Sequence, residues 1–334
     1  MNFKKKIIFL ILLLFLSLIL NIVFGSVIIP KGIIYNAFTH RLNTQSPYFQ
    51  IIFDYRIPKA IVAILTGVGL SVSGLLMQSI FRNPIVGPYV LGISSGGGLG
   101  VALLLLGGSF LGIQHIASIS ISIAAALGSI LTLLLIISFY SRTKNAVNLL
   151  IIGLMIGIFS GAIISILSYF TQANRLQKYV FWSMGNLGNI SWNNILILGV
   201  IISFSLIIIV FILKPINALL LGEHYALSMG INIKSTHLIV IILSGLMVGS
   251  ITAFVGPIAF VGLAVPHIAR LIFKSQMIQI LLPASLLIGS ILMLLCDSIA
   301  QLPGSVLVLP INAITAILGA PLVIYLINRK RKYS

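Results

Sequence analysis

The chain has 334 residues, of which 59% are hydrophobic and only 7% charged, and its mean hydropathy is +1.21. Soluble domains carry about 25% charged residues, so this composition excludes a soluble globular protein, a disordered chain and a collagen-like fibre. Three acidic residues, Asp54, Glu223 and Asp297, stand against 20 Lys and Arg, which gives a net charge of +17. The long apolar runs assign that charge to loops at the surface of a lipid bilayer, and not to nucleic-acid binding. The sequence therefore predicts an all-α polytopic membrane protein.

A membrane-spanning helix needs about 20 mostly apolar residues, because each residue rises 1.5 Å through a hydrocarbon core of ~30 Å. Nine stretches satisfy this requirement: 7–29, 57–81, 86–108, 116–140, 147–170, 193–213, 235–255, 278–299 and 306–327. The first stretch follows a basic N-terminus and resembles a signal peptide. It is too long for one and lacks a good cleavage site, so we expect it to be retained as the first helix.

A tenth apolar segment, 256–269, is short and has a proline near each end. This segment directly follows the predicted helix 235–255. Lys234 precedes that helix, and Arg270 follows the segment. If both charges are cytoplasmic, the chain must cross outward and back between them. We therefore predict that 256–269 is a short, broken crossing, which is tolerated at membrane depth only where protein or water covers its backbone. A re-entrant loop is the alternative.

Ten crossings place both termini on one side of the membrane. With the termini inside, most of the 20 basic residues are cytoplasmic, as the positive-inside rule requires. The exceptions are six basic residues that this topology leaves outside: Lys31, Arg41, Arg56, Lys59, Arg175 and Lys178. Charges outside oppose the rule, so we expect some of them to have a specific role.

Several kinds of chemistry have no sequence signal. The sequence contains no Gly-Lys dipeptide and hence no phosphate-binding loop, and no Cys/His cluster has metal-ligand spacing, so we expect no enzyme activity, cofactor or metal. The glycine-rich stretch 92–100 lies within a predicted span, where small residues usually allow helices to approach closely. An ion-coupled carrier would place carboxylates at mid-membrane, and Asp297 is the single candidate. The energy source is therefore expected in another polypeptide.

The loop 214–234 is too short and polar to span the membrane, and it predicts a pair of short amphipathic helices broken at Gly222 and Gly230. It resembles the coupling loop of ATP-binding-cassette (ABC) permeases, which docks into a cleft of the ATPase subunit. Further motifs resemble the FecCD family, the permeases of iron-siderophore, haem and cobalamin importers. These are Arg56-Ile57-Pro58-Lys59, Gly74–Gln78, Arg82–Gly96, Trp182–Gly185, Gly256–Leu263, Pro266–Arg270 and Leu309-Pro310 with Gly319–Pro321.

The resemblance covers essentially the whole chain and implies one transmembrane permease domain, residues 1–334, with the type II ABC importer fold. It also implies a homodimer with the pathway at its interface, two separate ATPase subunits below it and an external or periplasmic substrate-binding protein above it. The location would be the bacterial cytoplasmic (inner) membrane, with both termini cytoplasmic.

The resemblance assigns roles to specific residues. Those of the ATPase-coupling loop are Gly222, Glu223, Ala226 and Gly230, and those of the cytoplasmic gate are Thr143, Asn145, Ala146 and Val147. Those of the family's structural motifs are Asn83, Pro84, Pro88, Gly92, Pro266, His267 and Arg270. Arg56 and Lys59 would dock the binding protein, or else anchor the second helix at the headgroups. A third basic docking position of the family is replaced here by Gln301, so docking would use fewer contacts or would involve Lys31, Arg175 or Lys178.

The function expected from these observations is inward movement of a bulky metal chelate, with ferric siderophore as the first candidate. Haem, cobalamin and molybdate stay open as substrates. Two alternatives come from other classes of protein: an ion-coupled secondary carrier and a membrane anchor that transports nothing.

Overall fold

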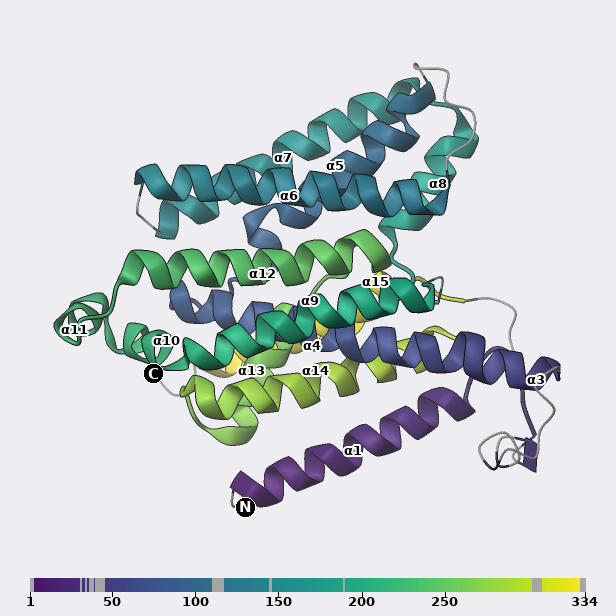
Figure 1. The fold of residues 1–334 in the computed structure, drawn as a ribbon, viewed down its shortest axis with the longest axis horizontal. Helices are drawn as coiled ribbons and strands as arrows, with labels where there is room; N and C mark the ends of the chain where they lie inside the picture. Colours follow the sequence, from purple (N-terminus) through teal and green to yellow (C-terminus); the bar gives the residue numbers. More distant parts are fainter. Residues whose placement is uncertain are drawn as a thin grey trace.

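The computed structural model describes residues 3–30, 32–33, 35, 39, 46–109, 117–143, 146–188, 190–301 and 308–330, and these residues form helices and loops without a strand (Figure 1). The longer helices are α1 (Phe3–Val23), α4 (Ile57–Ile80), α5 (Ile93–Leu105), α6 (Ser118–Thr143), α7 (Ala146–Phe170), α9 (Trp192–Phe211), α12 (Ile233–Val255), α13 (Val261–Phe273), α14 (Ile278–Ala300) and α15 (Ile311–Lys330). The shorter elements are α3 (Pro47–Gln50), η1 (Ile51–Arg56), η2 (Pro88–Leu91), η3 (Gly107–Ser109), α8 (Ala173–Ser183), α10 (Leu213–Leu221) and α11 (Glu223–Ser228).

The expected all-α polytopic architecture is confirmed. Among the described residues, seven helical segments are long and apolar enough to cross a membrane, and α4 forms one of them together with the preceding turns from Pro47. Three shorter apolar helices, α5, α13 and α15, correspond to the remaining predicted stretches. The ten predicted crossings are therefore all represented by a helix.

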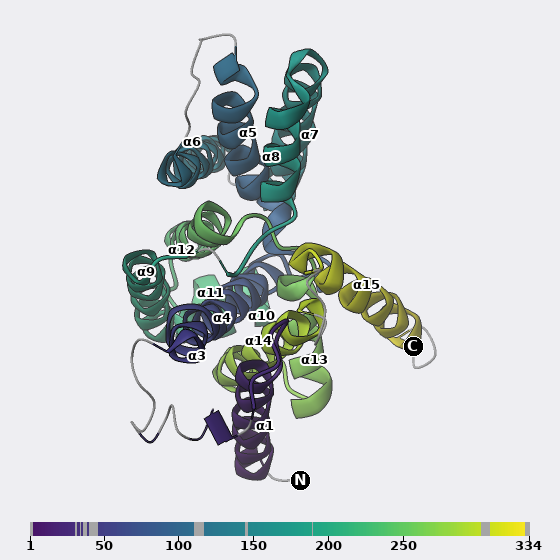
Figure 2. The ribbon, with the colours of Figure 1, turned by 90° about the vertical axis from the view of Figure 1, so that its right-hand side faces the viewer.

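Helix α4 forms the centre of the molecule. It packs against α14, α12, α13, α9 and α1, and most of its side chains are buried. Seen along the bundle in Figure 2, α9, α12 and α14 lie around α4, whereas α5, α6, α7 and α8 form a group on the far side of α12. The outer helices α1, α7 and α9 are just as apolar but mostly exposed, as expected for helices that face lipid or another protein subunit.

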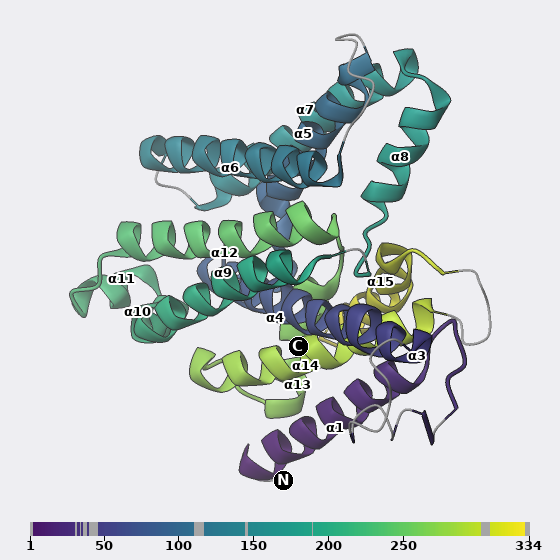
Figure 3. The same ribbon diagram turned by 45° about the vertical axis from the view of Figure 1, so that its right-hand side comes forward.

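The bundle has two ends, which we call the α10 end and the α8 end after the short helices there (Figure 3). At the α10 end, Lys6 Nζ donates a 2.6 Å hydrogen bond to the Ile272 carbonyl, and the ring of Tyr140 lies 6.1 Å from that of His237. The start of α1, the end of α6, the start of α12 and the end of α13 thus share one end. This is the arrangement that an even number of crossings requires.

The segment 256–269 runs from one end to the other, so the predicted broken crossing is confirmed. At the α8 end, the Asn186 N–H donates to the carbonyl of Val255, the last residue of α12, at 2.8 Å. Residues 256–260 have no helical structure, and α13 follows them and ends at the α10 end. There Phe273 packs edge-on against Phe3. A re-entrant loop would have returned to the α8 end.

The predicted span 86–108 is also broken, which the sequence analysis did not anticipate. Residues 86–92 form a turn and the short 3-10 helix η2, and the α-helix begins only at Ile93. Pro84 and Pro88 cannot donate to a helix ladder, and Gly92 has a left-handed φ of 72° that ends η2. Apolar composition alone did not reveal this break.

The glycine-rich stretch packs helices together, as predicted. A Cβ on Gly96 would lie 2.8 Å from the Gly128 carbonyl oxygen, and one on Gly100 would lie 2.2 Å from that of Ala124. Both distances are too short for any side chain, so α5 and α6 approach backbone to backbone.

Candidate functional site

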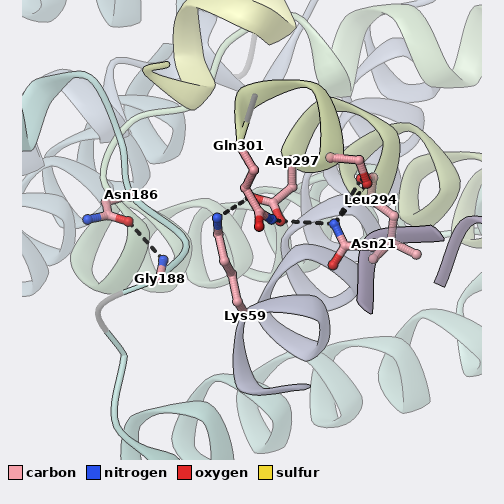
Figure 4. Close-up of polar contacts among 8 residues, drawn as sticks. Asn21, Lys59, Asn186, Gly188, Leu294, Asp297 and Gln301 are labelled. Atoms are coloured by element: carbon pink, nitrogen blue, oxygen red, sulfur yellow. Dashed lines mark hydrogen bonds and ion pairs between the residues drawn. The ribbon is translucent and has the colours of Figure 1, made fainter. Parts of the chain in front are cut away.

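A buried ion pair joins two helices at the α8 end. Lys59 Nζ, near the start of α4, lies 2.9 Å from Asp297 Oδ1, near the end of α14 (Figure 4). The exposed fraction of the side chain is 17% for Lys59 and 2% for Asp297. Within the described part of the chain this is the one salt bridge. Because an unpaired buried carboxylate is costly, the contact with Lys59 offsets the burial of Asp297.

Two amide side chains complete the shell of Asp297. Gln301 Nε2 donates to Asp297 Oδ2 at 2.7 Å, one turn further along the same helix. Asn21 Nδ2, from α1, donates to Asp297 Oδ2 at 2.9 Å and also reaches the Leu294 carbonyl and the Ser298 hydroxyl. In Figure 4, Lys59 and Asn21 approach the carboxylate from two sides. The network therefore ties α1, α4 and α14 together.

Arg56 caps the end of α1. Its guanidinium donates to the carbonyls of Ile22 at 2.6 Å, Val23 at 2.9 Å and Val27, and its exposed fraction is 6%. The last carbonyls of a helix lack partners and carry partial negative charge, so a cation stabilises them there. The guanidinium of Arg56 thus donates its hydrogen bonds within the protein.

The docking role of Arg56 and Lys59 stays a prediction, and the structure shows where both side chains lie. Lys59 lines a cavity of about 350 Å³ at the α8 end, together with Asp297, the loop 184–187 after α8 and residues 308–311 before α15. Gln301, which replaces the third basic docking position, bonds to Asp297 instead. Sequence reasoning missed Asn21, although a polar side chain inside an apolar span was the available signal.

The loop 214–234 forms the predicted pair of short helices at the α10 end. Gly222, with φ 131° and ψ 149°, separates α10 from α11, and Gly230, with φ 76°, follows α11. Both conformations favour glycine, because a Cβ would make them strained. Ala226 is fully buried and packs with Leu219 between the two helices. The predicted breaks at Gly222 and Gly230 are confirmed.

The outer surface of this pair is open. Glu223 is exposed at the first position of α11, where a carboxylate is favoured by the helix dipole. Four large apolar side chains around it are also exposed: Leu221, Tyr225, Leu227 and Met229. Apolar side chains around a charge form a surface suited to a protein partner.

The predicted gate lies where α6 is followed by α7. Helix α6 ends at Thr143 and α7 begins at Ala146. Asn145 lies outside the described residues, as do the side chains of Thr143, Ala146 and Val147. The gate assignment therefore stays a prediction.

The family motifs lie where helices break. Asn83 Oδ1 accepts a 3.0 Å hydrogen bond from the Ile85 N–H, which closes the turn that contains Pro84. Pro88 begins η2, and Gly92 joins η2 to α5. These residues shape the irregular backbone of the crossing 82–105.

The second motif lies on α13. Pro266 is inside the helix, and Arg270 donates from its guanidinium to Gln78 Oε1 on α4. His267 lines a cavity beside Arg270. No group of three or more His, Cys, Asp or Glu side chains that could hold a metal ion occurs in the described ranges.

Among the described residues, helices corresponding to the ten predicted crossings, with a helix pair at one end, define a polytopic helical membrane protein. The FecCD transport family matches residues 11–329, and the chain belongs to that family. It is 32% identical over 292 residues to the hemin transport system permease protein HmuU of Yersinia pestis, covering 87% of this chain and 86% of that protein.

Two further comparisons agree with this assignment. The chain is 32% identical over 321 residues to the vitamin B12 import system permease protein BtuC of Klebsiella pneumoniae, covering 96% of this chain and 92% of that protein. A solved structure described as an inward-facing conformation of a metal-chelate type ABC transporter superposes with a TM-score of 0.83 at 30% identity. That superposition covers 98% of this chain and 99% of the solved one.

Proposed function

We propose that the chain is the permease subunit of an ABC importer that moves a metal chelate into the cytoplasm. Its membership of the FecCD family and its likeness to hemin and vitamin B12 permeases support the substrate class. Ferric siderophore, haem and cobalamin are all chelates of this kind, and siderophore is our first candidate, with molybdate as a further one. The chain would lie in the bacterial inner membrane.

The observation that carries the proposal is the α10–α11 pair. Two short helices separated by Gly222 project from one end of the bundle, with Glu223 and apolar side chains exposed. Such a surface fits a cleft on a separate ATPase, which would supply the energy. The α10 end would then be cytoplasmic, with both termini on that side. This orientation also puts Lys6, Lys234 and Lys274 inside, as the positive-inside rule favours.

A second copy of the chain would complete the pathway. Two copies would bind two ATPase subunits, and the pathway would run between the two copies. The gate residues Thr143, Asn145, Ala146 and Val147 would close it on the cytoplasmic side. Exposed apolar side chains on α7 and α15 support an interface there: Ile151, Leu154, Met155, Ile158, Ile317 and Ile324.

The α8 end would receive an external substrate-binding protein. Lys59 supports this role because it keeps part of its ammonium side chain exposed beside a cavity. Arg56 would act from beneath, since it fixes the end of α1 next to that surface. Both residues would thus contribute to docking: Lys59 by its charge, and Arg56 because it holds the end of α1 in place.

A direct test is co-purification with the cognate ATPase and binding protein. We expect the ATPase to bind the detergent-purified chain, and chelate-loaded binding protein to raise its rate of ATP hydrolysis. Failure of the ATPase to bind would contradict the proposal. An ion-coupled secondary carrier is the candidate from another class, and the buried carboxylate of Asp297 is the one feature that favours it.

A further inference from the structure

A cationic cavity of about 390 Å³ lies at the α10 end between α4, α10 and α13. Its polar lining comes from Arg82 after α4, from His267 and Arg270 on α13, and from Gln78 and Gln276, while Leu220 of α10 adds an apolar wall. The cavity is separate from the exposed surface of the α10–α11 pair and from the Asp297 network at the α8 end. The cavity therefore needs an explanation of its own.

Arg270 enters the cavity with most of its donors unused. Gln78 Nε2 donates to the Leu263 carbonyl at 3.2 Å, which turns Gln78 Oε1 toward the guanidinium. This oxygen is the one acceptor for Arg270 among the residues that the structure describes. A guanidinium carries five N–H donors, so the remaining ones are available to a ligand.

Arg82 reaches the same cavity from a strained backbone. Its φ of 47° lies in the left-handed region, which is unfavourable for a residue with a Cβ. Its side chain is exposed, and no hydrogen-bond or ion-pair partner for it lies within the described ranges. Backbone strain of this kind persists where it serves a function, and here it holds a second guanidinium at the cavity of Arg270.

No Asp or Glu side chain lines the cavity. The sequence has three acidic residues, of which Asp297 is bound to Lys59 at the α8 end, Asp54 precedes α4 at that same end, and Glu223 begins α11 outside the lining. Two arginines that line one cavity without an acidic side chain in its lining favour an anion that accepts several hydrogen bonds.

We propose that this cavity binds a phosphate group, donated by the headgroup of an anionic phospholipid. The apolar wall supports the lipid source, because Leu271, which also lines the cavity, is 44% exposed next to exposed Ile272 and continues the cavity onto the apolar side of α13. Basic pockets between helices near the cytoplasmic surface are typical lipid-headgroup sites. Assignment to the inner leaflet rests on the orientation given under Proposed function.

The bound phosphate would link three elements. It would bridge Arg82 and Arg270 and so hold the end of α4 against α13, beside the α10 helix that leads to the ATPase surface. The lipid would thereby stabilise the arrangement of the coupling helices without touching the transported substrate.

The test uses the full-length chain, delipidated in detergent, with native mass spectrometry to count bound lipid. The probes are phosphatidylglycerol, phosphatidylcholine and inorganic phosphate. We expect one phosphatidylglycerol to bind in preference to phosphatidylcholine. Arg82→Gln should weaken its binding by about tenfold or more, because a hydrogen bond to a charged group contributes that much. Arg142→Gln, an exposed arginine at the same end but outside the cavity, is the matched control.

Arg270→Gln should weaken binding similarly, and its thermal unfolding is measured alongside because Arg270 also contacts Gln78. Displacement of the lipid by millimolar inorganic phosphate would support the anion site and name free phosphate as its source. Equal retention of phosphatidylglycerol by wild type, Arg82→Gln and Arg142→Gln would overturn the proposal. Loss of ATPase binding in Arg82→Gln with unchanged lipid binding would also overturn it and assign the cavity to the ATPase subunit. None of these readouts requires transport.

Discussion

Lys59 and Asp297 form a 2.9 Å ion pair that joins the start of α4 to the end of α14. The carboxylate is buried and also accepts hydrogen bonds from Asn21 on α1 and from Gln301. The chain has a net charge of +17 and three acidic residues. One of the three, Asp297, is thus paired with Lys59, the lysine predicted to dock the binding protein. The pair makes Lys59 both a structural element and a partly exposed cation.

Removing one member of this pair should destabilise the protein strongly. Asp297→Ala leaves the Lys59 ammonium without its counter-ion and should lower the free energy of unfolding by about 3–5 kcal/mol. The measurement is the thermal unfolding midpoint of the purified chain in detergent. Asp54→Asn, at an exposed acidic residue of the same end, is the control and should change little. An unchanged midpoint in Asp297→Ala would show that the ion pair does not hold α4 to α14.

Replacing both charges should recover much of that loss. Lys59→Met with Asp297→Leu removes two buried charges together, and apolar replacements of a buried pair are often neutral or stabilising. Asn21 and Gln301 would lose an acceptor, so recovery is expected to be incomplete. The double variant should be inserted and folded but, if Lys59 docks the binding protein, it should bind that protein weakly. Stability restored together with normal docking would leave Lys59 a purely structural role.

Docking by Lys59 should depend on salt. Lys59→Gln should slow association with the binding protein and reduce its dependence on ionic strength, because salt screens exposed charges over a Debye length of about 8–10 Å. Surface plasmon resonance with the chain in nanodiscs measures both effects. Arg142→Gln, at an exposed arginine of the α10 end, is the control for the loss of one positive charge. Equal salt slopes in both variants would favour the role of headgroup anchor.

Arg56 should act through stability more than through charge at the surface. Arg56→Gln removes the donors to the carbonyls of Ile22 and Val23 and should cost about 1–3 kcal/mol, the penalty for leaving buried acceptors unpaired. The expected result is a lower unfolding midpoint and faster proteolysis near the end of α1. A variant as stable as wild type that fails to bind the binding protein would instead make Arg56 a direct contact.

The α10–α11 pair should be required for ATPase coupling. Glu223→Ala combined with Leu227→Ser removes an exposed charge and an exposed apolar side chain from α11, so we expect weaker ATPase binding and hydrolysis that no longer drives uptake. Gly230→Pro should have the same effect, because its φ of 76° is closed to proline. Co-purification and uptake assays measure both, with Arg142→Gln as the control at the same end. Unchanged uptake in these variants would refute the coupling assignment.

The orientation of the two ends can be tested by labelling. In a Cys296→Ser background, Asn186→Cys at the α8 end and Gln276→Cys at the α10 end should react with an impermeant thiol reagent from opposite sides. Both positions are exposed, and Asn186 lies beside Val255, just before the broken crossing. Asn186→Cys should label from outside. Labelling of Gln276→Cys from outside would reverse the orientation.

Local sequence patterns predicted much of the fold, because length and apolar composition decide whether a segment can cross a membrane. Gly222 and Gly230 were likewise visible, since glycine between short apolar runs favours a break. The Pro84–Gly92 break was not resolved, because apolar residues continue through it. Contacts such as that between Asn21 and Asp297 join residues 276 positions apart, so no local pattern could reveal them. The cavity of Arg82 and Arg270 depends in the same way on the packing of α4 against α13.

The central claim is tested most directly by uptake into proteoliposomes that contain the chain alone or with its cognate ATPase and binding protein. The account predicts accumulation of a radiolabelled ferric siderophore, haem or cobalamin only when ATP, ATPase and binding protein are all present. Uptake of any of these by the chain alone, driven by a proton or sodium gradient, would contradict it.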